Sequence, residues 1–119
     1  MTADVLNPVA VENRIREIAG RIADSVTVCN ERYKAFMRAD LEYDQAFAHA
    51  YLDHEGPQTE KRYAAEVATR TEREARDVAD TAYRFADRLA KALESELRAY
   101  QSVGASVRAM YGVAGRGEN

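Results

Sequence analysis

The distribution of proline most restricts what this chain can fold into. The 119 residues contain only two prolines, Pro8 and Pro57, and both stand where a helix can begin. Asn7 before Pro8 is typical of an N-cap followed by the first helical residue, where the missing N–H of proline costs nothing. Glu55-Gly56-Pro57 is the only strong breaker in the middle of the chain, because glycine suits a helix end and proline cannot continue a helix.

These breakers predict two long helices, over residues 8–54 and 57–111, within a helical region of residues 8–112. At 1.5 Å per residue each would be roughly 70–80 Å long, and helices of that length usually pack as coiled coils. A short turn between them predicts an all-α fold, a long antiparallel helical hairpin. Residues 1–7 are predicted to be a flexible N-terminus and residues 113–119 a flexible glycine-rich tail.

Apolar residues recur at helical spacing along both predicted helices. In the first helix, two rows with a seven-residue spacing indicate a coiled-coil seam: Ile22, Cys29, Phe36, Tyr43 and Ala50, then Val26, Tyr33, Asp40, Phe47 and His54. In the second helix, an eleven-residue spacing favours a nearly straight course and runs through Val67, Val78, Leu89, Tyr100 and Tyr111. Residues 25–28 combine serine with β-branched residues, so we expect any break in the first helix there, with Gly104 the corresponding weak point of the second.

Folding about Gly56 would pair positions whose numbers sum to about 112. Two helices alone enclose little core, and Leu, Ile, Val and Phe supply only 22 of the 119 residues. Ordering such a chain costs roughly 1–2 kcal/mol per residue, more than a lone hairpin is expected to recover. We therefore predict self-association, most simply a homodimer in which two hairpins form a four-helix bundle. The alternative is a monomer whose first helix folds back at residues 25–28 to make a three-helix bundle.

One acidic residue occupies a seam position. Asp40 is predicted to face Arg73 and Arg76 across the hairpin, and we interpret the three as an ion pair that sets the register of the seam. The alternative, a catalytic carboxylate, lacks a second acid with a nearby histidine.

The usual catalytic and metal-binding patterns are missing. His49 and His54 are five residues apart and do not share a helix face, and the single cysteine, Cys29, lies far from both along the helix. No nucleotide-binding, zinc-protease or serine-hydrolase motif occurs. We expect a non-enzymatic protein without a metal or cofactor.

Basic residues recur along one side of the second predicted helix, and no acid lies between Glu96 and Glu118. Together with tyrosines, such a surface could contact phosphates and stack on bases, or contact a protein partner. The alternative is a solvated surface whose cations are favoured near a helix C-terminus, and the net charge of −3 argues against strong non-specific DNA binding. The candidate contact residues are Arg84, Arg88, Lys91, Arg98 and Arg108.

Three segments, residues 43–52, 55–62 and 97–102, resemble small Ala-rich helical proteins from the early regions of tailed bacteriophages, often encoded beside single-strand annealing or single-strand DNA-binding genes. Tyr100 stands where those proteins have leucine before the glutamine. The resemblance implies a role near phage DNA replication or recombination, and it assigns no catalytic residue.

No apolar run approaches the roughly 20 residues that span a bilayer, and residues 1–8 carry no basic cluster, so we expect a cytoplasmic protein without membrane contact. The expected function is that of a helical interaction protein, an accessory factor in phage DNA replication or recombination. Its expected partners are itself and an unidentified protein. Direct binding of single-stranded nucleic acid and inhibition of a host protein are the alternatives.

Overall fold

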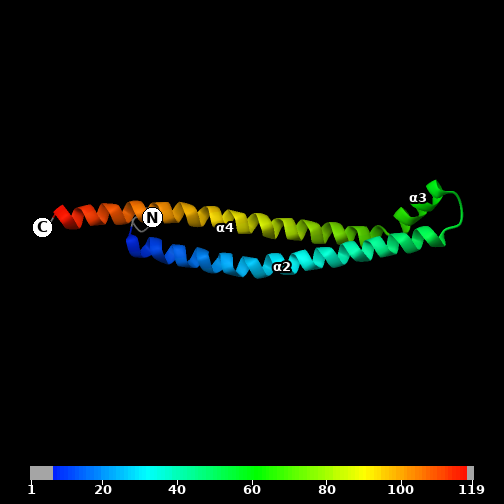
Figure 1. Ribbon diagram of the computed structural model, residues 1–119, viewed down its shortest axis with the longest axis horizontal. Helices are drawn as coiled ribbons and strands as arrows, with labels where there is room; N and C mark the ends of the chain where they lie inside the picture. The colour runs from blue at the N-terminus through cyan, green and yellow to red at the C-terminus, as the bar shows by residue number, and fades with distance from the viewer. Residues whose placement is uncertain (1–6, 118–119) are drawn as a thin grey trace. The chain divides into compact units, whose positions relative to one another are not determined.

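The computed structural model describes residues 7–117, and within them it contains three helices and no strand. They are α2 (Pro8–Asp53), α3 (Gln58–Ala68) and α4 (Arg70–Gly117), shown in Figure 1. This confirms the all-α prediction. The chain divides into two units: unit 1 contains residues up to 26 and from 88 onward, and unit 2 contains residues 27–87.

The predicted helix start and the central turn are confirmed. The Asn7 side-chain oxygen accepts hydrogen bonds from the backbone N–H groups of Val9 (2.9 Å) and Ala10 (3.4 Å), which is N-cap geometry. After α2, Gly56 has a φ of 140°, a value that a residue with a side chain rarely adopts. An added Cβ there would lie 3.0 Å from Glu60 Oε2, but this atom ends an exposed flexible side chain that can move, so the backbone conformation is what favours glycine.

The interruption lies elsewhere than the sequence suggested. Helix α2 is continuous through residues 25–28, so neither a break nor a fold-back occurs there. The Ser25 hydroxyl donates to the Ile22 carbonyl oxygen at 2.6 Å, and its polar group is thereby satisfied within the helix.

The second predicted helix is divided at Thr69, between α3 and α4. Thr69 is buried, with φ −110° and ψ 20°, and its hydroxyl donates to the Ala65 carbonyl oxygen at 2.7 Å. The Arg73 backbone N–H donates to the Thr69 carbonyl oxygen at 3.0 Å and continues the chain into α4. This break involves neither glycine nor proline. The hydroxyl bond accompanies it but does not alone cause it, because Thr81 makes the same bond to the Asp77 carbonyl oxygen at 2.9 Å inside continuous α4.

The second predicted helix also ends at a different residue than expected. Helix α4 continues to Gly117, so the predicted end of the second helix at residue 111 is wrong by about six residues. Residues 1–6 of the predicted flexible N-terminus, and residues 118–119 of the predicted tail, lie outside the described residues.

The buried apolar side chains are distributed unequally. In unit 1, α2 and α4 bury the branched residues Val11, Ile18, Leu93 and Val107. Gly104 is also buried, and a Cβ built on it would lie 3.3 Å from Val11 Cγ1 and 3.6 Å from Ile15 Cδ1. The Gly104 backbone therefore packs closely against the first two turns of α2.

Unit 2 has no large buried apolar side chain among its residues; those that are buried are Ala65, Thr69 and Ala86. Aromatic residues make its ring contacts instead, and of these Tyr33 is exposed and the others are half-buried. The Tyr33 and Tyr83 rings contact each other across α2 and α4 with centroids 5.2 Å apart. Along α2, the Phe47 ring lies 6.1 Å from that of Tyr43 and 6.5 Å from that of Tyr51.

The seam of α2 is confirmed in its first row, because every member from Ile22 to Ala50 is half-buried. The second row is wrong at its start: Val26 is 67% exposed and Tyr33 is exposed as well, whereas Ser25 is half-buried in the seam. Ser25, three residues after Ile22, therefore takes the inward position that Val26 was predicted to hold.

The eleven-residue row of the second helix is wrong as a description of the core. Val67, Val78, Leu89 and Tyr111 are exposed. The inward residues of α4 follow a seven-residue repeat in two rows: Glu72, Ala79, Ala86, Leu93, Tyr100 and Val107, with Arg76, Tyr83, Ala90, Leu97 and Gly104. Small residues hold many of these positions and allow close helix approach, so the large apolar residues did not reveal the seam.

Candidate interaction surface

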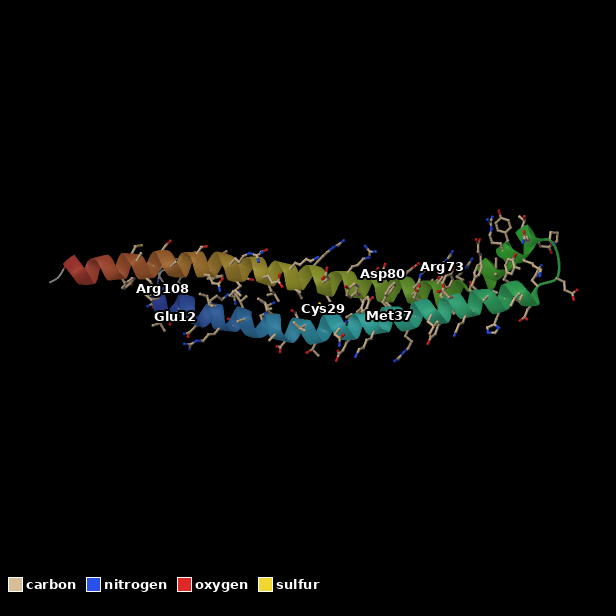
Figure 2. All side chains as sticks on the ribbon, viewed as in Figure 1. Glu12, Cys29, Met37, Arg73, Asp80 and Arg108 are labelled. Carbon is tan, nitrogen blue, oxygen red and sulfur yellow. The ribbon has the colours of Figure 1, made fainter. Side chains whose placement is uncertain are left out.

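The five predicted contact residues, Arg84, Arg88, Lys91, Arg98 and Arg108, are all exposed on α4. Arg84 belongs to unit 2 and the other four to unit 1. Figure 2 labels Arg108, whose Nη1 atom lies 3.4 Å from a Cβ built on Gly104. The structure therefore leaves all five side chains accessible to a partner.

Acidic residues accompany these cations. Arg84 Nε donates to Asp80 Oδ1 at 3.0 Å, and Arg98 Nη2 donates to Ser95 Oγ at 3.3 Å. The acid-then-base spacing of four residues in Asp80–Arg84 recurs seven and fourteen residues later, at 87–91 and 94–98. Residues 80–98 contain four acids and four bases, so this face alternates in charge and has no net positive charge. Net positive charge on α4 begins only beyond Glu96.

The predicted register pair does not form. Asp40 is half-buried, and neither Asp40 nor Arg73 takes part in an ion pair of the described residues. Arg76 donates to Asp77 from Nε (3.3 Å) and Nη2 (3.2 Å). Its guanidinium carbon lies 4.5 Å from the Tyr43 ring centroid, so Arg76 reaches α2 through an aromatic face instead of a carboxylate.

The register of unit 2 also differs from the expected one. The contacts of Tyr33 with Tyr83 and of Tyr43 with Arg76 join positions whose numbers sum to 116 and 119, instead of about 112. The pairing is therefore displaced by about one to two helical turns, and α3 and the interruption at Thr69 lie between the paired segments.

An ion-pair network that sequence reasoning missed joins α2 to α4 in unit 1. Arg14 Nη1 lies 2.9 Å from Glu17 Oε1, and Arg14 Nη2 lies 2.8 Å from Glu96 Oε1. The Arg14 guanidinium carbon is 5.8 Å from the Tyr100 ring centroid. Hydrogen bonds to Glu17, then to Glu96 and Tyr100, raise the pKa of Arg14 above its ordinary value. The sequence feature that could have indicated this network is Arg14 itself, a basic residue that lies between the regularly spaced apolar residues Val11, Ile15 and Ile18.

The turn of unit 2 carries a small open pocket of about 310 Å³, lined by Tyr51, Gln58, Thr59 and Arg62. Beside it, His54 Nε2 lies 3.0 Å from Glu60 Oε1, which keeps His54 at the helix end as expected. His49 is exposed and Cys29 is half-buried in the seam. Over the residues with a described placement, no group of three or more His, Cys, Asp or Glu side chains could hold a metal ion.

One carboxylate oxygen in the seam of α4 lacks a partner. Glu72 Oε2 is buried, and it has no hydrogen bond within the described part of the chain. An unsatisfied buried polar atom destabilises a fold by about 1–3 kcal/mol, whereas a carboxylate in the first turn of a helix is favoured by up to about 1 kcal/mol.

We therefore expect Glu72→Leu to raise the free energy of unfolding by about 1 kcal/mol, because the penalty exceeds the lost charge interaction. Urea denaturation monitored by circular dichroism would measure the change. The matched control, Glu74→Leu, alters an exposed residue two positions further on and should change stability by less than about 0.5 kcal/mol. A destabilised Glu72→Leu variant would contradict this account.

Large apolar side chains are exposed on faces of α2 and α4 that the hairpin does not cover. On α2 they include Met37, Leu41 and Leu52, and on α4 they include Val78, Phe85 and Leu89. Among the described helices none is both long enough and apolar enough to cross a membrane.

Comparison with known proteins finds no family model, no curated protein and no solved structure that matches the chain. The function is therefore argued from the surfaces described above.

Proposed function

We propose that the protein is a non-enzymatic helical interaction protein that works in a self-associated form, most simply a homodimer in which two hairpins build a four-helix bundle. The observation that carries the proposal is the imbalance in unit 2. Its buried residues are two alanines and a threonine, while Met37, Leu41, Val78 and Phe85 are each more than half exposed.

Burying these exposed apolar side chains against a second copy would lower the free energy of the protein. Each large aliphatic or aromatic side chain that leaves water contributes about 1.5–3 kcal/mol, and unit 2 gains little of this from its own interior. Association of a second hairpin would bury the exposed rows without disturbing the aromatic contacts between α2 and α4. A domain of this size ordinarily needs a larger apolar core than unit 2 has.

Light scattering coupled to size exclusion tests the proposal directly. We expect a native mass of about twice the 13.3 kDa of one chain, or a larger multiple of it. A mass of one chain at all concentrations up to the millimolar range, with cooperative thermal unfolding, would refute self-association.

The partner beyond a second copy is proposed from the phage resemblance: a protein of DNA replication or recombination. Co-expression with the products of neighbouring genes, followed by purification of a complex at stoichiometric ratio, tests this part. Recovery of the chain without any such product would count against it.

A specific observation also favours direct nucleic-acid binding as a second candidate function. Arg98 and Arg108 are exposed on a stretch of α4 that has no acid between Glu96 and Glu118. Two such cations on one helix could neutralise phosphates of a single strand.

We expect any binding to labelled single-stranded DNA to weaken with salt, and Arg98→Glu with Arg108→Glu to lower the log–log salt slope by about 1.4, since each phosphate contact contributes about 0.7. Arg84→Glu is the matched control, because Arg84 is already paired with Asp80 and its loss should change the slope less. Absence of binding at low salt would remove this candidate function.

A further inference from the structure

One face of α4 is apolar although it lies away from the seam with α2. Its large members are Val78, Phe85 and Leu89, which are 70%, 68% and 42% exposed. They follow spacings of seven and four residues, so at 3.6 residues per turn they lie within about 40° of one another around the helix. Most of this face lies in unit 2, and it continues along the same helix to Leu89.

Smaller residues complete this face, which we call the outer face of α4. Thr71 and Ala75 are exposed and Ala82 is half-buried, and all three lie about 40–80° around the helix from Phe85, on the same side as Leu89. From its N-terminal end, the outer face is thus formed by Thr71, Ala75, Val78, Ala82, Phe85 and Leu89.

The sizes of these residues are complementary about position 80 of the chain. Each large member has a smaller one at the same distance in the opposite direction: Val78 with Ala82 at two residues, Phe85 with Ala75 at five, and Leu89 with Thr71 at nine. If the outer face is read from its other end, each large residue is therefore exchanged for a small one. A surface of this kind fits a second copy of itself that runs in the opposite direction.

Two charged residues border the outer face. Glu74 and Arg88 are exposed and lie about 20° and 60° around the helix from Phe85, on the side away from the small residues. They stand seven residues before and seven residues after Thr81, and neither takes part in an ion pair of the described residues. Every other charged residue between positions 71 and 89 lies at least about 80° around the helix from Phe85, and Figure 2 labels one of these, Asp80.

We propose that the outer face of α4 is a self-association surface, on which the α4 helix of a second copy lies antiparallel with the two-fold axis beside residues 80–81. This inference rests on the proposed function and specifies its interface. The alignment sets Phe85 of one copy opposite Ala75 of the other, and it sets Val78 opposite Ala82. A large residue against a small one at each level permits close helix approach.

The charges agree with the same alignment. Glu74 of one copy faces Arg88 of the other, and the two-fold symmetry forms this pair twice, while Arg70 at the start of α4 faces the uncharged Ala92. A parallel copy in register would instead set Phe85 against Phe85 and Glu74 against Glu74. Size and charge are independent features that share one centre, and an unrelated helix would have no reason to match either, so the outer face specifies a second copy as its occupant.

Replacing an apolar residue of the outer face tests the interface. Phe85→Ser should raise the dimer dissociation constant at least about tenfold, because two buried rings leave the dimer. The matched control is Leu41→Ser, which alters a residue of α2 that is 56% exposed and lies outside the outer face, and it should change the constant by less than about twofold. Sedimentation equilibrium measures both constants, and circular dichroism checks that helix content is unchanged.

A charge exchange provides a second readout that tests the alignment. Glu74→Arg and Arg88→Glu should each raise the dissociation constant at least about fivefold at low salt, because each places like charges together twice in the dimer. Neutralising Glu74 would remove only the attraction of an exposed pair, which is small. The double variant should return the constant to within about threefold of wild type, and an equimolar mixture of the two single variants should form a heterodimer more tightly than either variant forms a homodimer.

The outcomes separate the inference from the proposed function. If wild type is dimeric but Phe85→Ser dimerises equally well, or Leu41→Ser is the variant that weakens the dimer, this interface is wrong and self-association still stands. The same holds if the double charge variant is as weak as the single variants. If wild type is monomeric at every concentration, the interface and the self-association proposal both fail.

Discussion

Replacing Ile18 with alanine is expected to lower the free energy of unfolding by about 3 kcal/mol. Ile18 has no exposed surface and, with Val11, is one of the largest fully buried side chains of the described residues. Removing three carbons there leaves a cavity between α2 and α4 in unit 1, where few other large residues can fill it. Urea denaturation at one fixed protein concentration measures the loss, because self-association makes stability depend on concentration.

Val26→Ala is the matched control for this prediction. Val26 lies eight residues further along α2 but is 67% exposed, so truncating it should change stability by less than about 0.5 kcal/mol. Equal losses from the two truncations would mean that the residues have equal burial in solution, and would contradict the core of unit 1 described above.

Replacing Gly104 with leucine is expected to lower the free energy of unfolding by about 2–3 kcal/mol. Its Cβ alone would lie 3.3 Å from Val11 Cγ1, and the remaining side-chain atoms would force α2 and α4 apart. Helix propensity acts in the opposite direction, since leucine is favoured over glycine in a helix interior by somewhat less than about 1 kcal/mol. Steric exclusion in the buried site outweighs that gain.

Gly20→Leu supplies the comparison with the same chemical change. Gly20 lies in the interior of α2 with no heavy atom within 4 Å of its added Cβ, so leucine there should raise the free energy of unfolding by about 0.5 kcal/mol. Thermal denaturation of both variants would show opposite shifts in Tm. Similar increases at both positions would refute the close approach of α4 to α2 at Gly104.

The proposal of self-association depends on which apolar side chains are buried and which are exposed in each unit. Unit 1 buries the four branched side chains Val11, Ile18, Leu93 and Val107, whereas unit 2 buries no large apolar side chain and leaves Met37 and Leu41 exposed. Segments with few buried contacts open most readily and gain most from a partner. The surface for a second copy is therefore expected in unit 2.

The ends of the helices could be predicted because they depend on local chemistry. Asn7 caps α2 with its own side chain, and Gly56 adopts a backbone conformation that other residues avoid. The interruption at Thr69 escaped prediction because it involves neither glycine nor proline, and because a threonine bonded to the carbonyl four residues earlier also occurs at Thr81 without a break.

The sequence analysis identified the candidate contact residues on α4 as cations, and the structure shows that they are exposed. The sequence analysis did not identify the acidic residues that accompany them. Asp80 and its equivalents, four residues before each base, were visible in the sequence, and their spacing could have shown that residues 80–98 alternate in charge. The seam pair was predicted at Asp40, whereas the cross-helix ion pair lies at Arg14 and Glu96, because the register depends on how the helices pack.

By itself the sequence determined the helical class, the start of α2 and the turn at Gly56, since each follows from the conformational limits of a few neighbouring residues. Only the tertiary structure decided the register, the seven-residue seam of α4 and the faces left in water. Those depend on contacts between residues far apart in the chain, where small side chains such as Gly104 and Ala86 allow close packing that apolar spacing alone does not indicate.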